Sequence, residues 1–323
     1  MRLLVTGGAG YIGSHVVWES LNQGHDVTIF DDLSTSNQEN INLNAKFING
    51  SVTSDLDLFN LFDQSEYDVV IHLAGKKSSG ESMVSPQIYA ENNIVGSIKL
   101  IKKCIDKRIK AFIFSSSAAV YGLPEYVPID ENHKLSPLNY YGYTKLVIEN
   151  NLQWLSKLSG LKYISLRYFN AAGYDIKKRV ISVEKNSDNL IPIVMEVANR
   201  TRKNIHVYGN DYNTKDGTGV RDYIHVNDLA RAHIDAIRYV IKKKKNLTVN
   251  LGTGIGYSVL DIIKKTAHVS NKKINYDVKD RRAGDVGCII AKSSYAKEVL
   301  DWEADLSNLD TIIKSAWEIY KKD

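Results

Sequence analysis

The sequence predicts an α/β fold, in which a doubly wound parallel sheet of the Rossmann type is followed by a smaller C-terminal α/β domain. Over the first half of the chain, short apolar runs alternate with longer stretches of helical periodicity. Strands that are separated by helices form βαβ units with right-handed crossovers, which give a parallel sheet covered on both faces. After Asn170 this alternation loosens, which indicates the boundary of the second domain.

The expected elements follow in chain order. Apolar runs predict strands at residues 3–5, 27–30, 45–48, 69–72, 112–114 and 163–166. Helical periodicity predicts helices over residues 12–22, 88–107 and 141–159. In the second half we expect helices near 189–200, 226–242, 259–268 and 309–322, short strands at 206–207 and 248–250, and loops over 174–188 and 208–220. The domains are then residues 1–170, to which parts of 226–250 return, and residues 171–323.

The composition is that of a globular protein. With 323 residues, of which 43% are hydrophobic, the chain can bury a sizeable core. The net charge of +5 is modest and the basic residues are scattered, so we expect no nucleic-acid partner. No apolar run is long enough to span a bilayer and no signal peptide precedes the first strand, so we expect a cytoplasmic protein without a membrane segment. Cys104 and Cys288 lack partners at a metal-ligand spacing, so no metal site is expected.

A glycine-rich turn, TGGAGYIG over residues 6–13, follows the first strand and opens the first helix. Gly7, Gly10 and Gly13 allow a tight turn, a close approach of a pyrophosphate to the backbone, and close packing of helix on strand. The helix that starts at Tyr11 and Ile12 offers free N–H groups and a positive dipole to phosphates. A strand before and a helix after are the context in which this motif binds a dinucleotide.

The second strand ends at Asp31 and Asp32, 18 residues beyond Gly13. A carboxylate at this place accepts hydrogen bonds from the ribose hydroxyls of adenosine and repels a 2′-phosphate. The two features together predict NAD, and not NADP, as the cofactor.

Tyr141 and Lys145 stand near the start of a predicted helix, four residues apart and therefore on one face. An ammonium beside a phenol, next to a positively charged nicotinamide ring, lowers the pKa of the phenol and makes it a general base. The fifth strand ends in Ser115, Ser116 and Ser117, at the edge of the sheet where ligands bind. These residues predict a catalytic site, with Tyr141, Lys145 and Ser117 as its members.

By these residues the chain resembles the extended short-chain dehydrogenase/reductase family and, within it, the UDP-glucose/UDP-galactose 4-epimerases. The resemblance covers nearly the whole chain. It is carried by the glycine-rich turn, by SSSAAVYG at 115–122, the Tyr141–Lys145 pair, LRYFN at 166–170, GND at 209–211, DGTGVRDYIHV at 216–226 and RRAGD at 281–285. The last three segments are far more specific than the cofactor turn.

The resemblance implies an enzyme that inverts C4 of a UDP-hexose. Tyr141 would take the proton from the sugar O4, while Ser117 holds or relays it. Hydride would pass from C4 to NAD, and the 4-keto sugar would turn about its link to the diphosphate and take the hydride back on its other face. NAD is regenerated in each turnover, so it should stay bound.

The resemblance also implies two sets of contacts. Residues expected at the cofactor, besides the glycine turn, Asp31 and Asp32, are Ser51, Val52, Lys77, Asn92, Ser115, Tyr141, Lys145 and Phe169. Residues expected at the UDP-sugar are Lys77, Ser117, Tyr141, Asn170, Asn189, Leu190, Tyr208, Arg221, Arg282, Asp285 and Ile289. Arginine suits the second set because its planar fork pairs with phosphate oxygens.

The chain departs from the family at three places. Ser51 stands where an Asp commonly contacts adenine, and the loop over 174–188 lacks the better-known enterobacterial sequence. Ile289 stands where a large aromatic often lies beside the 2-substituent of the sugar. The choice between plain and N-acetylated UDP-hexoses, or both, is therefore open.

Two other functions are compatible with the fold. A sugar-nucleotide 4,6-dehydratase needs an acid and a base after the catalytic hydroxyl, but Ala118 and Ala119 follow Ser117 and cannot transfer a proton. A non-catalytic NAD-binding sensor does not need Tyr141 or Lys145, and both are present. The epimerase is therefore favoured.

The second of two predicted helices carries more apolar surface than one face of a sheet needs. The helix over 88–107 carries one stripe, Ile94, Ile98, Ile101 and Ile105. The helix over 141–159 carries two neighbouring stripes, Ile148/Leu152/Leu155 and Val147/Trp154/Leu158. Packing such helix pairs across a twofold axis as a four-helix bundle, as the family does, predicts a homodimer. The alternative is a wide stripe that is buried wholly within one chain.

Overall fold

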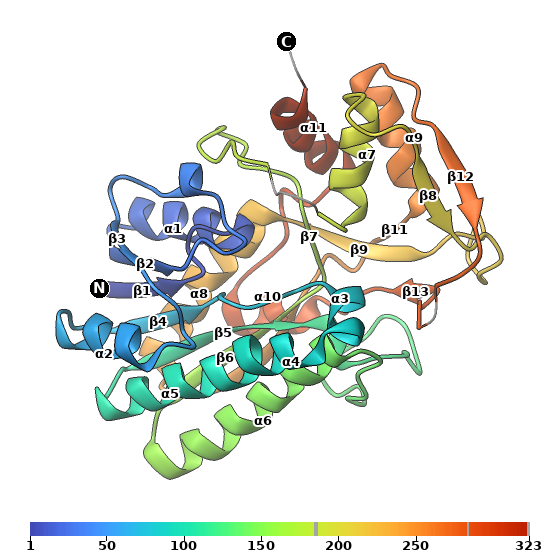
Figure 1. Cartoon of the computed structure of the whole chain (residues 1–323). Helices are drawn as coiled ribbons and strands as arrows, with labels where there is room; N and C mark the ends of the chain where they lie inside the picture. Colours follow the sequence, from blue (N-terminus) through green and yellow to red (C-terminus); the bar gives the residue numbers. More distant parts are fainter. Residues whose placement is uncertain (184–186, 283, 322–323) are drawn as a thin grey trace.

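The computed structural model describes residues 1–323 apart from 184–186, 283 and 322–323. Its centre is a seven-stranded sheet with the strand order β10-β6-β5-β4-β1-β2-β3 (Figure 1). The strands are β1 (Arg2–Thr6), β2 (Asp26–Asp31), β3 (Lys46–Asn49), β4 (Val69–His72), β5 (Ala111–Ser117), β6 (Lys162–Tyr168) and β10 (Leu247–Leu251). All neighbours run parallel, so the carboxyl ends of these strands share one edge, where ligands bind in sheets of this kind. The predicted parallel sheet is confirmed.

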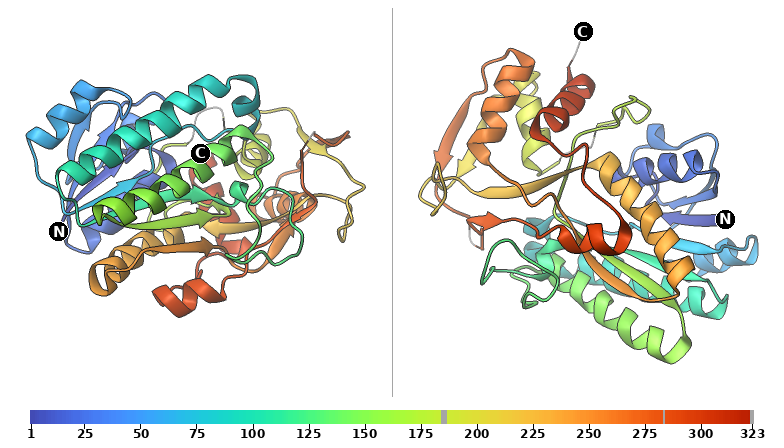
Figure 2. Two further views of the ribbon diagram at one scale, coloured as in Figure 1. Left: turned by 90° about the horizontal axis from the view of Figure 1, so that it is seen from below. Right: turned by 180° about the vertical axis from the view of Figure 1, so that it is seen from behind.

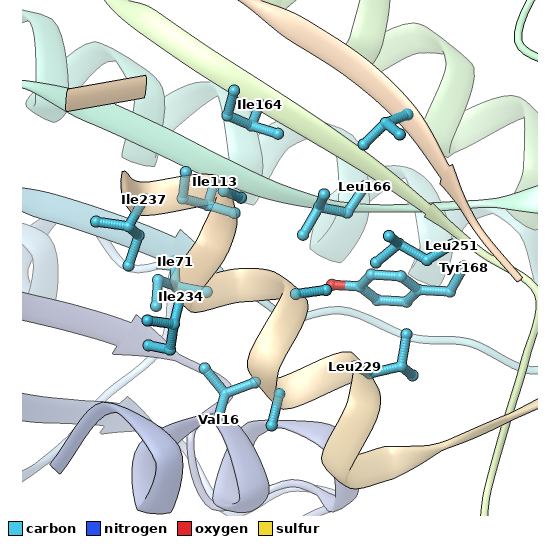
Figure 3. Packing of buried hydrophobic residues seen from close by; sticks show 14 of the residues in the cluster. Val16, Ile71, Ile113, Ile164, Leu166, Tyr168, Leu229, Ile234, Ile237 and Leu251 are labelled. Atoms are coloured by element: carbon cyan, nitrogen blue, oxygen red, sulfur yellow. The ribbon is translucent and has the colours of Figure 1, made fainter. Parts of the chain in front are cut away.

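Helices cover both faces of this sheet (Figure 2). On one face α1 (Tyr11–Asn22) packs against α8 (Val226–Lys243), beside α10 (Ser294–Leu300). On the other face lie α2 (Asp55–Asp63), α5 (Gly96–Asp106) and α6 (Tyr140–Ser159). Successive side chains of a strand point to opposite faces, so Leu3 and Leu4 of β1 belong to different hydrophobic cores. In the first core, Leu229 and Ile234 of α8 lie over the sheet (Figure 3).

The helix predicted over 88–107 is interrupted. The chain forms α3 (Ser79–Val84) and α4 (Pro86–Tyr89), then a π-helical stretch, η2 (Ala90–Val95), and only then α5. Asn93 lies in this π-helical stretch, and its side chain is hydrogen-bonded to Lys76 and Thr144. The apolar repeat continues across the widened turn, so periodicity alone does not reveal it. Such turns are frequent at functional sites.

The second half forms a smaller unit around β9 (Val220–His225). β9 pairs with β7 (Asn170–Ala172), β11 (Gly256–Ser258) and β13 (Cys288–Ile289), while β8 (Ile205–Tyr208) pairs with β12 (Tyr276–Lys279). The helices α7 (Leu190–Ala198), α9 (Val259–Ser270) and α11 (Leu309–Tyr320) pack on one another around a third core. Two short 3₁₀ helices lie in the first half, η1 (Gln38–Asn40) and η3 (Ala118–Val120).

Several elements were not predicted, namely α2, α3, α4, α10, β7, β9, β11, β12 and β13. Most of them hold two to seven residues, over which local periodicity is weak, but the nine-residue α2 and the six-residue β9 are not short for elements of their kind. Residues 184–186 of the predicted loop, residue 322 of the last predicted helix and residue 283 of the RRAGD segment lie outside the described residues. Within the described ranges, no helix combines the length and apolar character that crossing a bilayer requires.

Candidate active site

The glycine turn lies between β1 and α1, at the carboxyl edge of the sheet. A Cβ at Gly13 would lie 2.0 Å from the Gly7 carbonyl oxygen, and a Cβ at Gly7, whose φ is +73°, would lie 2.6 Å from the Ala74 nitrogen. Gly10 caps the amino end of α1 and no side chain satisfies the N–H groups there. Tyr11 and Ile12 are the first residues of α1. The turn is therefore a backbone cradle open to an anion.

Asp31 ends β2 next to this cradle and is buried. Its carboxylate accepts hydrogen bonds from the Ala9 N–H (3.0 Å), the Leu33 N–H (2.9 Å) and the Ser36 hydroxyl (3.1 Å). Burial raises the pKa of Asp31, and these hydrogen bonds oppose the rise. Asp32 is exposed, and its carboxylate accepts from the Ser34 N–H.

Ser51 and Val52 follow β3 on the other side of Asp31. The Gly50 N–H donates to the Asp31 carbonyl, which joins the two strand ends. The Ser51 N–H donates to the Asp57 carboxylate, and its hydroxyl lies 3.0 Å from the Thr53 hydroxyl. Three features therefore fit an NAD molecule: the glycine turn for its diphosphate, the Asp31 carboxylate for its adenosine ribose, and the polar residues after β3 beside them.

The last three residues of β5 are serines, and α6 packs against this strand. The Lys145 ammonium donates to the Ser115 carbonyl at 2.7 Å and lies 5.7 Å from the centre of the Tyr141 ring. The Ser117 side chain lies close enough to the Tyr141 hydroxyl to favour the ionised phenol. The structure thus brings the three predicted catalytic residues together.

Close packing makes this arrangement possible. A Cβ at Gly142 would lie 2.5 Å from the Ala119 carbonyl oxygen, so α6 can approach the end of β5 only with glycine here. Asn139 caps α6 through the Gly142 N–H, and the Tyr141 N–H donates to the Ser82 hydroxyl. The first turn of α6 is therefore fixed from three sides.

Burial shifts the pKa values of the catalytic pair. It raises the pKa of the Tyr141 phenol, and the nearby Ser117 side chain opposes that rise. It lowers the pKa of Lys145 to about 8, against the charge of Glu149. The Lys145 ammonium donates to a backbone carbonyl and not to the phenol, so the lowering of the Tyr141 pKa expected from this neighbour is not found.

The loop after β4 contributes Lys77 and meets η2. The amide of Asn92 in η2 donates to the Ile88 carbonyl at 2.9 Å. The neighbouring Asn93 is buried, accepts from the Lys76 N–H and donates to the Lys76 carbonyl and the Thr144 hydroxyl. Sequence reasoning missed Asn93, whose side-chain partners Lys76 and Thr144 lie 17 and 51 residues away.

The residues predicted at the UDP-sugar gather in the smaller unit, apart from Lys77, Ser117 and Tyr141. Ile289 of β13 pairs in register with Arg221 of β9. The Arg282 guanidinium lies 4.6 Å from the centre of the Tyr208 ring and donates to the Asp285 carboxylate at 2.9 Å. Figure 1 shows β9 and β13 beyond the carboxyl ends of β5 and β6.

The remaining predicted residues join the two units. Phe169, buried, and Asn170, the first residue of β7, directly follow β6. Asn189 caps α7, Leu190 begins it, and Asn189 lines the same small pocket as Tyr11. Tyr11 in turn donates from its hydroxyl to the Gly173 carbonyl at 2.5 Å. The residues predicted for the cofactor and those predicted for the UDP-sugar therefore meet along this junction. Among the described residues, no cluster of His, Cys, Asp and Glu could hold a metal ion.

Comparisons with known proteins agree with this geometry. Residues 3–252 match the NAD dependent epimerase/dehydratase family. The UDP-glucose 4-epimerase of Halalkalibacterium halodurans is 40% identical over 322 residues, which are 100% of this chain and 96% of that protein. The structure of UDP-glucose 4-epimerase from Brucella ovis in complex with NAD superposes with a TM-score of 0.95 at 38% identity, covering 99% of this chain and 98% of that one. The Bifidobacterium longum enzyme in complex with NAD⁺ and UDP gives a TM-score of 0.94 at 37% identity, covering 99% and 98%.

Proposed function

The chain belongs to the NAD dependent epimerase/dehydratase family, and from that premise we propose that it is an NAD-dependent enzyme that inverts C4 of the hexose in UDP-glucose and UDP-galactose. The observation that carries the proposal is that Tyr141, Ser117 and Lys145 lie together at the same carboxyl edge of the sheet as the cradle, in a chain that is similar to UDP-glucose 4-epimerases along its whole length.

The cofactor site is proposed at the carboxyl edge of the sheet. The N–H groups at the start of α1 would bind the diphosphate, and Asp31 would hold the adenosine ribose, with Asp32, Ser51 and Val52 beside it. Lys77, Asn92, Ser115 and Phe169 would complete the site. When bound, NAD accepts the hydride of C4 and returns it.

Within the proposed mechanism, Tyr141 takes the proton from the sugar O4 as general base and returns it after the ring has turned. The Ser117 hydroxyl, which lies near that of Tyr141, would hold the same sugar O4 by a hydrogen bond. In the proposed mechanism the Lys145 ammonium, 5.7 Å from the centre of the Tyr141 ring, would favour the phenolate once the cofactor is bound, although no lowering of the Tyr141 pKa is found in the structure alone. Because the proton returns to the oxygen from which it came, no further acid or base is required.

The nucleotide would be anchored while the hexose moves. Arg221 and Arg282 would pair with the diphosphate, and Asn170, Asn189, Leu190, Tyr208 and Asp285 would line the rest of the pocket. In this division residues 1–170, with parts of 226–250, bind the cofactor and residues 171–323 bind the UDP-sugar. We further propose a cytoplasmic homodimer, whose interface is considered in the Discussion.

A dehydratase lacks support because η3 after Ser117 holds Ala118 and Ala119, neither of which transfers protons. A non-catalytic NAD sensor would need neither the fixed first turn of α6 nor the placement of Ser117 near Tyr141.

The test is proton NMR of the purified protein with UDP-galactose, in which the anomeric signal of UDP-glucose should grow without added cofactor. Denaturing the protein should release NAD or NADH, because the cycle does not require its exchange. An absolute need for added NAD, with none released on denaturation, would contradict the proposal.

A further inference from the structure

Glu149 lies on the same face of α6 as the catalytic pair, one turn beyond Lys145. Tyr141, Lys145 and Glu149 follow at intervals of four residues, and both Lys145 (7% exposed) and Glu149 (2% exposed) are buried. The Ser116 hydroxyl donates to Glu149 Oε1 at 2.5 Å. Three consecutive serines of β5 thus meet three consecutive turns of α6: the Ser117 side chain lies near Tyr141, the Ser115 carbonyl accepts from Lys145, and the Ser116 hydroxyl donates to Glu149.

Arg167 of β6 holds the same carboxylate in a bidentate pair. Its Nε donates to Glu149 Oε1 at 2.9 Å and its Nη2 to Oε2 at 2.6 Å. Its Nη1 donates to the Tyr121 hydroxyl, which in turn donates to Asn250. A carboxylate bound at both oxygens has little freedom, so its charge stays at a fixed place behind Lys145.

The titratable groups that act on Lys145 come from two elements, His72 of β4 and Tyr141 and Glu149 of α6. Two groups of β6 lie one step further away: Tyr168 acts on Tyr141, and Arg167 is paired with Glu149. Burial lowers the pKa of His72 to about 3 and raises that of Tyr168, so both are neutral near pH 8. Among these groups, Glu149 supplies the negative charge that opposes the loss of the Lys145 proton.

We propose that Glu149 is a positioning residue of the reaction, whose fixed carboxylate keeps Lys145 protonated and thereby sets the upper pH limit of epimerisation. This inference rests on the proposed function for its link to activity, but its effect on Lys145 can be measured without turnover. Burial favours the neutral amine, and activity that needs the ammonium is lost as the pH rises through the Lys145 pKa. Removing the negative charge must therefore move that limit to lower pH.

The experiment separates charge from shape. Glu149→Gln keeps the shape of the side chain and removes the charge, whereas Glu149→Asp keeps the charge and shortens the side chain. The pKa of Lys145 is followed by NMR of its ¹³C-labelled ε-methylene, assigned with Lys145→Met, and the pH profile of kcat is recorded with UDP-galactose. We expect Glu149→Gln to lower both the pKa and the alkaline limit by about one unit, as the loss of a buried neighbouring charge does. Glu149→Asp should lose stability but stay near the wild-type limit.

Two further variants control for the loss of a hydrogen bond and for a failure to fold. Ser116→Ala removes one hydrogen bond to Glu149 without changing any charge, so its Lys145 pKa should match that of the wild type. If Glu149→Gln does not fold because Arg167 is left unpaired, Glu149→Gln/Arg167→Met removes both charges, and its Lys145 pKa should still lie below the wild-type value. An unchanged Lys145 pKa in every folded variant that lacks the carboxylate would overturn the inference. Absence of epimerisation by the wild type would instead contradict the proposed function, and the NMR titration would still decide the role of Glu149.

Discussion

Tyr141 is the residue on which the proposed reaction depends most directly. Tyr141→Phe keeps the partly buried ring and removes the hydroxyl that lies near Ser117. We expect kcat to fall by at least ~10²-fold, the usual effect of losing a positioned general base, while NAD content and thermal unfolding stay at wild-type values. Steady-state assays with UDP-galactose measure the loss.

Tyr143→Phe is the matched control. Tyr143 lies on the same turn, but 49% of it is exposed and it does not share the i, i+4 relation with Lys145. Its removal should leave kcat unchanged. If Tyr141→Phe keeps full activity and Tyr143→Phe or Tyr140→Phe loses it, the general base is Tyr143 or Tyr140 and not Tyr141.

Ile289 bears on which sugars are accepted. It is only partly buried and lies beside Arg221 in the register of β9 and β13. An aliphatic wall disfavours an acetamido group at binding and again when the sugar turns, so UDP-N-acetylgalactosamine should be a detectable but weaker substrate than UDP-galactose. Ile289→Ser should raise the ratio of the two activities in favour of the N-acetyl sugar, and Ile289→Tyr should abolish the N-acetyl activity. A change of this size is worth about 1–3 kcal/mol, so discrimination stays partial in the wild type. If the ratio of the two activities is the same in the wild type, Ile289→Ser and Ile289→Tyr, a residue other than Ile289 lies beside the 2-substituent of the sugar.

Residues whose chemistry is tied to a local motif could be predicted from the sequence. Tyr141 and Lys145 are four residues apart, and the glycines of the cradle occupy one turn, so spacing alone brought them together. Glu149 and Asn93 were missed because their partners are distant in sequence. Glu149 is held by Ser116 and Arg167, 33 and 18 residues away, and Asn93 meets Thr144 across 51 residues. No local pattern encodes such pairs.

At the scale of elements, the close approach of α1 to the glycine turn gives a test of the cofactor cradle. In Gly13→Ala the new Cβ would lie 2.0 Å from the Gly7 carbonyl oxygen and 2.8 Å from the Gly8 Cα, both backbone atoms. α1 must then move away from β1, which should cost about 1–3 kcal/mol of stability and reduce the NAD content of the purified protein. Thermal unfolding and nucleotide release on denaturation measure the two effects. Gly80→Ala, where the added Cβ meets nothing within 4 Å, should change neither.

The long elements of the first half were predictable because each is buried along a regular repeat. β4 occupies the predicted residues 69–72, and α6 starts one residue before the predicted 141 and ends at the predicted 159. Among the strands of the smaller unit, β8 was predicted at 206–207, whereas β7, β11 and β13 were not, since they hold two or three residues each and are defined by their pairing with other strands. The π-helical stretch at Ala90–Val95 likewise depends on what Asn93 contacts and not on the apolar repeat.

At the scale of the whole molecule, α5 and α6 lie side by side on the outside of the sheet, as Figure 2 shows. The two stripes of α6 have different environments. Ile148 and Leu152 are buried against the sheet, whereas Trp154 is 65% and Leu158 78% exposed. Val95 and Ile98, at the junction of η2 and α5, are each 37% exposed. One chain therefore leaves the second stripe uncovered, which the alternative of burial within a single chain does not explain.

We propose that a second copy of the chain covers this stripe, with α5 and α6 of both copies forming a four-helix bundle about a twofold axis. Light scattering at micromolar concentration should then give about twice the monomer mass of 36.3 kDa. Leu158→Glu places a charge in the proposed interface, where it would be desolvated without a partner, and should give the monomer mass. Leu43→Glu is the matched control, because Leu43 is 96% exposed in the loop before β3 and should leave the dimer intact. Both variants should keep the thermal stability of the monomer fold, since neither side chain contributes to its core. A wild-type protein that scatters as a monomer, or a Leu158→Glu protein that remains a dimer, would show that this face is not the interface.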